Sequence, residues 1–252
     1  MGANETNFTP YGSRFATHIG DYIRLATQFP TIRAREFEAL VNFADLRRPE
    51  SVLEAPAEGR IIERLLPKTK VVRADMMEVK SADAGHIDLT NWTLANFEND
   101  RFDAVLSIVP IHHAGEEEKR AYVDGAFRVL RANGVLAFGE VQRNSKVHTF
   151  LDEFVNTYSK TGHVGAYVER DFLTTLDDVG FEQTSSELLN CDWIFDSYDA
   201  VFFYVTRLFD LEGLTHDVLI EILATQFGLK RDRDKIVMPW ELLFFRGVKP
   251  SS

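Results

Sequence analysis

Two adjacent histidines and one glutamate are the residues whose type and position point most directly to chemistry. His112 and His113 follow an apolar run, and Glu140 stands near the end of a second apolar run. An imidazole exchanges a proton near neutral pH, so either histidine is a candidate general base, and Glu140 is a weaker candidate. The alternative for the histidines is structural, with a ring that bonds backbone groups ahead of a helix beginning at Glu116.

We expect no metal site among these side chains. His112, His113 and Glu140 could converge, but adjacent histidines rarely both reach one ion with good geometry. Ser145 and the single Cys191 show no sequence signature of a catalytic nucleophile.

Residues 51–67, SVLEAPAEGRIIERLLP, contain a short apolar strand, a tight acidic loop and the start of a helix. This order is typical of an α/β protein that binds a ligand where a strand ends. A second strand over residues 70–74 leads to Asp75, at the spacing of a carboxylate that holds the ribose of a nucleotide-like cofactor. Such loops usually carry two or three glycines, and this one has only Gly59.

Strands and helices alternate through the middle of the chain. The strands are expected at residues 51–54, 70–74, 103–108 and 134–141. The helices are expected at residues 14–26, from a Thr31 cap to before Pro49, and at 116–130, 145–159 and 169–179. This order predicts an α/β fold with a doubly wound, mostly parallel sheet and right-handed crossovers.

Composition bounds the class of protein. The chain has 252 residues, of which 45% are apolar, enough for one large domain with a full core. A formal charge of −11 argues against nucleic acid as a partner. One cysteine indicates a reducing compartment, and no apolar run is long enough to span a membrane. We therefore expect a cytoplasmic protein with no membrane partner.

Several segments together resemble the class I S-adenosylmethionine-dependent methyltransferase superfamily. VLEAPAEGR is similar to its first strand and glycine loop, VVRADMM to its second strand, and HIDLTNW to the segment that contacts adenine. RFDAVLSIVPIHH and RVLRANGVLAFGEV resemble its fourth strand and its fifth. The resemblance implies a seven-stranded Rossmann-like sheet whose last strand, over residues 240–248, is antiparallel.

The resemblance also implies the cofactor, S-adenosylmethionine or its product S-adenosylhomocysteine. The residues that match the cofactor-binding positions are Glu54, Ala55, Pro56, Ala57, Asp75, Met76, Asp88, Leu89 and Ser107. One position departs from the pattern, because Glu58 stands where a glycine lets the backbone approach the cofactor.

Helical segments at both ends are expected to enclose an acceptor. We divide the chain into an N-terminal helical cap (1–48), a cofactor-binding core (49–195 and 236–252) and a helical insertion (196–235). The insertion is too apolar for solvated surface helices, so it forms either a lid on the N-terminal helices or a homodimer contact. The predicted acceptor chamber is aromatic, with Tyr11, Phe15, His18, Tyr22, Trp193, Tyr198 and Phe202.

The expected function is methyl transfer to an oxygen or nitrogen, less readily a carbon, of a small molecule, as in secondary metabolism. One alternative is a protein of this fold that has lost methyl transfer and catalyses another reaction in the same pocket. Another is a non-catalytic binding scaffold, since a fold does not fix a function.

Overall fold

The computed structural model describes residues 19–75, 86–88 and 92–251 of the chain. Three residues of the predicted acceptor chamber, Tyr11, Phe15 and His18, lie outside the described residues. So do the predicted cofactor contacts Met76 and Leu89.

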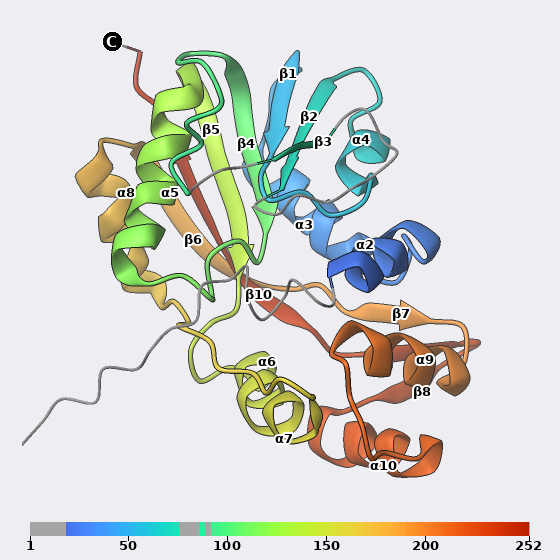
Figure 1. Cartoon of the computed structure of the whole chain (residues 1–252). Coiled ribbons are helices and arrows are strands. Elements are labelled where there is room, and N and C mark those ends of the chain that lie inside the picture. Colours follow the sequence, from blue (N-terminus) through green and yellow to red (C-terminus); the bar gives the residue numbers. More distant parts are fainter. Residues whose placement is uncertain (1–18, 76–85, 89–91, 252) are drawn as a thin grey trace, which may run out of the picture.

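The central element is a seven-stranded sheet with the order β3-β2-β1-β4-β5-β10-β6 (Figure 1). Its strands are β1 (Ser51–Glu54), β2 (Lys70–Asp75), β3 (His86–Asp88), β4 (Phe102–Ile108), β5 (Leu130–Glu140), β6 (Glu182–Asn190) and β10 (Glu241–Val248). The strands from β3 to β5 pair in parallel, and β10 is antiparallel to both β5 and β6. The predicted seven-stranded, mostly parallel sheet with an antiparallel last strand is therefore confirmed.

Helices cover both faces of the sheet, as an almost continuously apolar central strand requires. Val52 belongs to the hydrophobic cluster on the face covered by α3 (Ala34–Ala44). Its neighbour Leu53 belongs to the cluster under α5 (Glu116–Val129) and α8 (Leu173–Val179), because successive side chains of a strand point to opposite faces. The remaining core helix, α4 (Ile61–Leu65), is short.

The second N-terminal helix begins differently from the prediction, while the predicted start of the first, at residue 14, lies outside the described residues. The helix α2 is described over Ile19–Gln28, and α3 starts after Arg33 rather than after a Thr31 cap. Residues 29–34 form turns in which the Ile32 N–H donates to the Phe29 carbonyl and the Ala34 N–H to the Thr31 carbonyl. These turns place Arg33, not Thr31, at the position preceding the helix.

After β5, the predicted helix over 145–159 consists of α6 (Lys146–Thr149), a π-helical segment (Phe150–Val155) and α7 (Asn156–Tyr158). The predicted helix over 169–179 begins with a 3₁₀ turn (Arg170–Phe172) ahead of α8.

The insertion contains the two predicted helices, α9 (Tyr198–Leu208) and α10 (His216–Phe227). The Ser197 and Thr215 side chains cap them, and Gly228, with φ 77°, ends α10 in the left-handed conformation that glycine favours. A small antiparallel sheet that the sequence analysis did not predict borders them, with the order β7-β9-β8. Its strands are β7 (Trp193–Phe195), β8 (Lys230–Asp232) and β9 (Lys235–Met238).

The insertion packs against the N-terminal helices and shares their core. Helix α9 contacts α2, and the Phe29 ring lies 5.8 Å from the ring of Phe203 and 6.2 Å from that of Tyr204. The Ile194 N–H of β7 donates to the Ile32 carbonyl. Figure 1 shows α9, α10 and the small sheet below the end of the central sheet at which β5 finishes.

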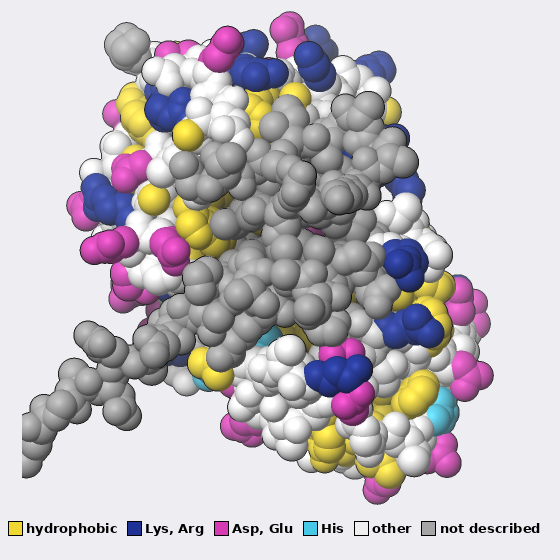
Figure 2. Space-filling view, viewed as in Figure 1, with side chains coloured by type: hydrophobic (Ala, Val, Ile, Leu, Met, Phe, Trp, Pro, Cys, Tyr) yellow, Lys and Arg dark blue, Asp and Glu magenta, His cyan; other side chains and the backbone are white. Residues whose placement is uncertain are grey.

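Charged side chains of both signs are mixed on the molecular face that Figure 2 shows, where Lys and Arg do not gather into one basic patch. In the described part of the chain, no helix combines the length and apolar character needed to cross a membrane.

Candidate active site

The loop after β1 is held by backbone hydrogen bonds to the two neighbouring strands. The Ala55 N–H donates to the Leu106 carbonyl of β4, and the Ala57 N–H donates to the Ala74 carbonyl of β2. Two side chains support it further, because the Ser107 hydroxyl donates to the Pro56 carbonyl and the Tyr122 hydroxyl to the Ala55 carbonyl. Ser107 thus braces this loop through its hydroxyl group.

Glu54, the last residue of β1, carries a buried carboxylate with one oxygen unsatisfied. Its Oε1 accepts the Glu58 N–H at 3.1 Å, while its buried Oε2 has no hydrogen-bond partner among the described residues. Burial raises the pKa of the Glu54 carboxyl well above its usual range. An unpaired buried carboxylate is costly, so this oxygen is suited to a cationic ligand group.

Glu58, the residue in place of a glycine, is turned towards a buried arginine. Its Oε2 lies 2.7 Å from Nη1 of Arg33, whose guanidinium also pairs with Glu36 at 2.6 Å. The Glu36 Oε1 accepts the Trp193 Nε1–H at 2.7 Å. The negative charge that Glu58 adds to the loop is therefore compensated by Arg33, just before α3, a partner that the sequence analysis missed.

Asp75 and Asp88 end two adjacent parallel strands. They are register partners at the ends of β2 and β3, so the backbone brings both carboxylate-bearing residues to the same edge of the sheet. The loop after β1 begins at that edge, one strand away.

His112 and His113 lie in the loop after β4, beside the end of β5. The loop begins at Val109, whose φ of 50° is rare for a β-branched residue. Both Glu140 oxygens accept backbone N–H groups, Oε1 from Ile111 and Oε2 from Val141. Burial raises the Glu140 pKa to about 7. With both oxygens engaged, Glu140 acts as the residue that fixes the histidine loop.

The two imidazoles are close together and one of them is strongly buried. The ring centroids of His112 and His113 are 3.9 Å apart. Burial lowers the His112 pKa well below its usual range, and the neighbouring His113 and His163 lower it further. His112 is therefore a neutral imidazole at physiological pH.

A third histidine, His163, joins this pair from a distant segment and was missed by the sequence analysis. It follows Gly162, whose φ of 66° gives the chain a left-handed turn. The His163 N–H donates to the Asn156 side chain, and the Ala166 N–H donates to the His112 carbonyl. The only local signal for this turn is the glycine, and nothing in it indicates where the turn packs.

Two cavities adjoin the histidines. One is lined by His112, His163, Glu58 and Trp193, and the other by His113 and His163; Leu208 and Phe209 line both. Of the predicted acceptor residues, Trp193 therefore lies at a cavity. Tyr22 is on the first part of α2, residues 19–23, of which only the backbone is described.

Tyr198 and Phe202 line neither of these two cavities. The Arg231 guanidinium lies 5.4 Å from the Tyr198 ring centroid, and the Phe202 ring packs 5.5 Å from His216. The end of α9 turns Leu208 and Phe209 towards the cavities instead. Helical spacing shows that α9 has an apolar side but does not show which neighbour that side meets.

The family profile described as a methyltransferase domain matches residues 63–138. The matched region runs from α4 to β5 and begins after the loop that carries Glu58. No curated protein matches the sequence.

Solved structures share the fold at low sequence identity. A SAM-dependent methyltransferase from Thermotoga maritima has a TM-score of 0.59 at 12% identity, over 94% of this chain and 99% of that chain. A second structure is the 1,6-didemethyltoxoflavin-N1-methyltransferase of Burkholderia thailandensis, solved with 1,6-didemethyltoxoflavin and S-adenosylhomocysteine. It has a TM-score of 0.56 at 12% identity, over 100% of this chain and 94% of that chain. The [4+2]-cyclase SpnF has a TM-score of 0.54 at 12% identity, over 87% of this chain and 82% of that chain.

The methyltransferase-domain match covers less than a third of the chain, and the sheet has the fold of S-adenosylmethionine-dependent methyltransferases. One of the solved structures that share this fold contains S-adenosylhomocysteine.

Proposed function

We propose that this protein transfers a methyl group from S-adenosylmethionine to an oxygen or nitrogen atom of a small molecule. The observation that carries the proposal is the buried Oε2 of Glu54, which has no partner among the described residues and stands where β1 enters the loop at which the superfamily binds the cofactor. The amino group of the cofactor is a cation that would satisfy this oxygen.

The residues around the loop fit the cofactor. Glu54 would accept the cofactor's ammonium group, and Asp75 and Asp88 stand at adjacent strand ends for its ribose and adenine ends. Glu58 leaves the loop less open than a glycine would, but its carboxylate is paired with Arg33 and so is held away from the carboxylate of the cofactor. When bound, the cofactor supplies an electrophilic methyl group on a sulfonium.

The acceptor would lie in the cavities beside the histidines. Trp193, Leu208 and Phe209 supply apolar walls that exclude water, and the rigid placement of both reactants supplies much of the acceleration. His112 is neutral and can receive a proton from an acceptor hydroxyl or amine. Glu140 positions His112 through the loop rather than by contact with the acceptor.

Calorimetric titration with S-adenosylmethionine and S-adenosylhomocysteine tests the cofactor. Glu54→Gln should weaken binding by roughly 1.5–3 kcal/mol, the contribution of a hydrogen bond to a charged group. Glu63→Gln is a matched control, because Glu63 lies on the neighbouring α4 and is turned towards Arg73 at 3.3 Å. No binding by the wild-type protein, or equal affinities for the wild type and the Glu54→Gln variant, would contradict the assignment.

A second candidate function is a different reaction in the same pocket. The observation that favours it is Glu58, which adds a side chain at the position where the superfamily has a glycine. The cyclase SpnF is an example of this fold with another activity named for it. Tight cofactor binding without methyl transfer to any of a broad panel of phenols, amines and enols would favour this second function.

A further inference from the structure

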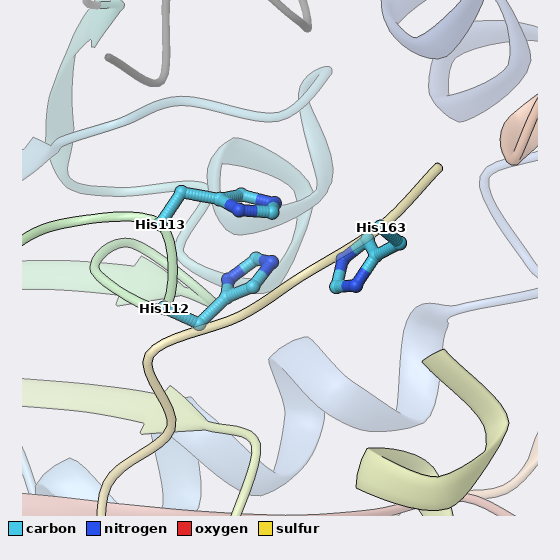
Figure 3. A group of neighbouring side chains, drawn as sticks. All are labelled: His112, His113 and His163. Carbon is cyan, nitrogen blue, oxygen red and sulfur yellow. The ribbon is translucent and has the colours of Figure 1, made fainter. Parts of the chain in front are cut away.

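The three histidines of the candidate site form a group that the proposed methyl transfer does not fully use. His112 and His113 come from the loop after β4, and His163 comes from the segment after α7. One ring nitrogen from each histidine lies within 4.8 Å of the corresponding nitrogens of the other two. Figure 3 shows the three rings facing a common point.

Hydrogen bonds fix His163 in the orientation that a metal ligand needs. Its Nδ1 lies 3.2 Å from Oδ1 of Asp152, which also accepts the Tyr167 hydroxyl at 2.5 Å. With Nδ1–H donating to Asp152, the lone pair of His163 lies on Nε2. A carboxylate behind a histidine is the usual outer partner of a metal-binding imidazole.

The His112 ring also offers a nitrogen to an ion. Within the part of the chain that the structure describes, Nδ1 of His112 makes no hydrogen bond; it lies 3.9 Å from Oε2 of Glu140, too far for one. The segment with His163 is tied to His112 by the Ala166 N–H, so the two sides of the cluster are held together without the ion. Asp152 and Glu140 bring acidic groups to a site that would receive a dication.

We propose that His112, His113 and His163 together bind one divalent transition-metal ion, with zinc the best match to the ligand set. Three histidines with a fourth position open to water or substrate form a known kind of zinc site. Tetrahedral coordination places the ligand nitrogens about 3.3 Å apart, so the rings must move inwards by about 1 Å on binding. His163 lies on a segment without regular secondary structure, which can accommodate this movement.

The ion would occupy the border between the two cavities, because His163 lines both, His112 lines one and His113 the other. The open coordination position would therefore face a bound small molecule with an oxygen or nitrogen donor. Binding of the ion does not depend on methyl transfer and can be measured without an acceptor or cofactor.

Metal binding to the full-length chain tests the proposal. Protein stripped with a chelator and dialysed should bind one equivalent of Zn²⁺ in calorimetry. The thermal midpoint of the stripped protein should then rise with added Zn²⁺, because the ion binds the folded state. Co²⁺ should give the intense visible absorption of a four-coordinate site.

Variants separate the site from incidental binding. His163→Ala should weaken Zn²⁺ binding at least about 100-fold. Asp152→Asn should weaken it about 10- to 100-fold, because it alters the carboxylate that holds the His163 ring. Asp152→Asn should also alter the Co²⁺ spectrum, a change that a purely structural role would not produce. His216→Ala, which removes a more exposed histidine on α10, should bind as the wild type does.

Circular dichroism of the metal-free variants checks that each is folded; if His163→Ala fails to fold, His113→Ala takes its place. Binding of less than half an equivalent by the wild type would overturn the proposal. Equal losses in His163→Ala and His216→Ala, or full binding by a folded variant of the cluster, would overturn it as well.

Discussion

Replacement of Arg33 by methionine should show how much this arginine stabilises the fold by compensating the buried carboxylates of Glu36 and Glu58. The Arg33 guanidinium is buried and compensates two carboxylates, with contacts of 2.6 Å to Glu36 and 2.7 Å to Glu58. Arg33→Met keeps an apolar side chain of similar length and removes the cation. Glu36, which is fully buried, then retains only the Trp193 Nε1–H as a hydrogen-bond donor among the contacts described above.

The size of the effect follows from the protonation of Glu36. Removal of one partner from a buried ion pair costs about 3–5 kcal/mol. Burial already raises the Glu36 pKa above its ordinary 4.5, and the loss of Arg33 should raise it further. A buried carboxyl group can avoid the penalty of a buried charge by taking up a proton. From the ordinary pKa of 4.5, protonation costs about 3.4 kcal/mol at pH 7 and about 0.7 kcal/mol at pH 5. These values are the upper limits of the stability that an unpaired Glu36 alone can cost the variant at each pH.

The sign of the pH dependence is fixed by the same shift. A carboxyl group whose pKa is raised by folding binds a proton more tightly in the folded state, so stability falls as pH rises above 4.5. The other titratable groups against Glu36 are Glu58, Cys191 and Tyr204; burial raises the pKa of the thiol and the phenol, which stay neutral. The variant should therefore lose more stability relative to the wild type at pH 7 than at pH 5, by at most about 2.7 kcal/mol, because the wild-type Glu36 pKa is itself already raised.

Urea unfolding of the wild type and variant at pH 5 and pH 7 measures this difference. Arg35→Met, two residues further along in the first turn of α3, is the matched control, because the Arg35 side chain is 53% exposed and 3.6 Å from Asp192. That exposed pair should contribute at most about 1 kcal/mol. Adding Glu36→Gln to Arg33→Met should restore stability at pH 7. A penalty for Arg33→Met that is the same at both pH values, or no larger than that of Arg35→Met, would refute the reasoning.

Three further outcomes are expected. Glu58→Gly should tighten S-adenosylmethionine binding in calorimetry, since it restores backbone access; weaker binding would show that the carboxylate contacts the cofactor. Phe209→Ala should raise the acceptor KM about tenfold, roughly 1.4 kcal/mol, with cofactor affinity retained; an unchanged KM, or an equal effect of Phe203→Ala on the exposed side of α9, would place the acceptor elsewhere. Gly162→Ala should lower the free energy of unfolding by roughly 1–2 kcal/mol, because its φ is 66° and a Cβ would lie 2.8 Å from the Asn156 Oδ1. Gly213→Ala, at a φ of 74° in open space, should lose less in the same urea titration.

The sequence alone determined the sheet and the elements with strong local signals. The first strand, Ser51–Glu54, has the predicted bounds, and α10 begins after Thr215 and ends at Gly228 as predicted. These predictions succeed because residue periodicity and capping are local properties that neighbouring residues in the chain specify. The resemblance to one superfamily then implied a seven-stranded, mostly parallel sheet with an antiparallel last strand, while the order of the strands came from the structure.

Only the tertiary structure decided which side chains meet at the candidate site. Arg33 and His163 are far apart in the chain, and each reaches the site because the element that carries it packs there. Likewise, α9 has apolar residues on more than one side, so its spacing could not tell Phe202 from Leu208 as the residue that faces the cavity. The ion pair of Glu58 with Arg33 and the grouping of the histidines are long-range contacts, which hydrophobic packing creates and local sequence does not specify.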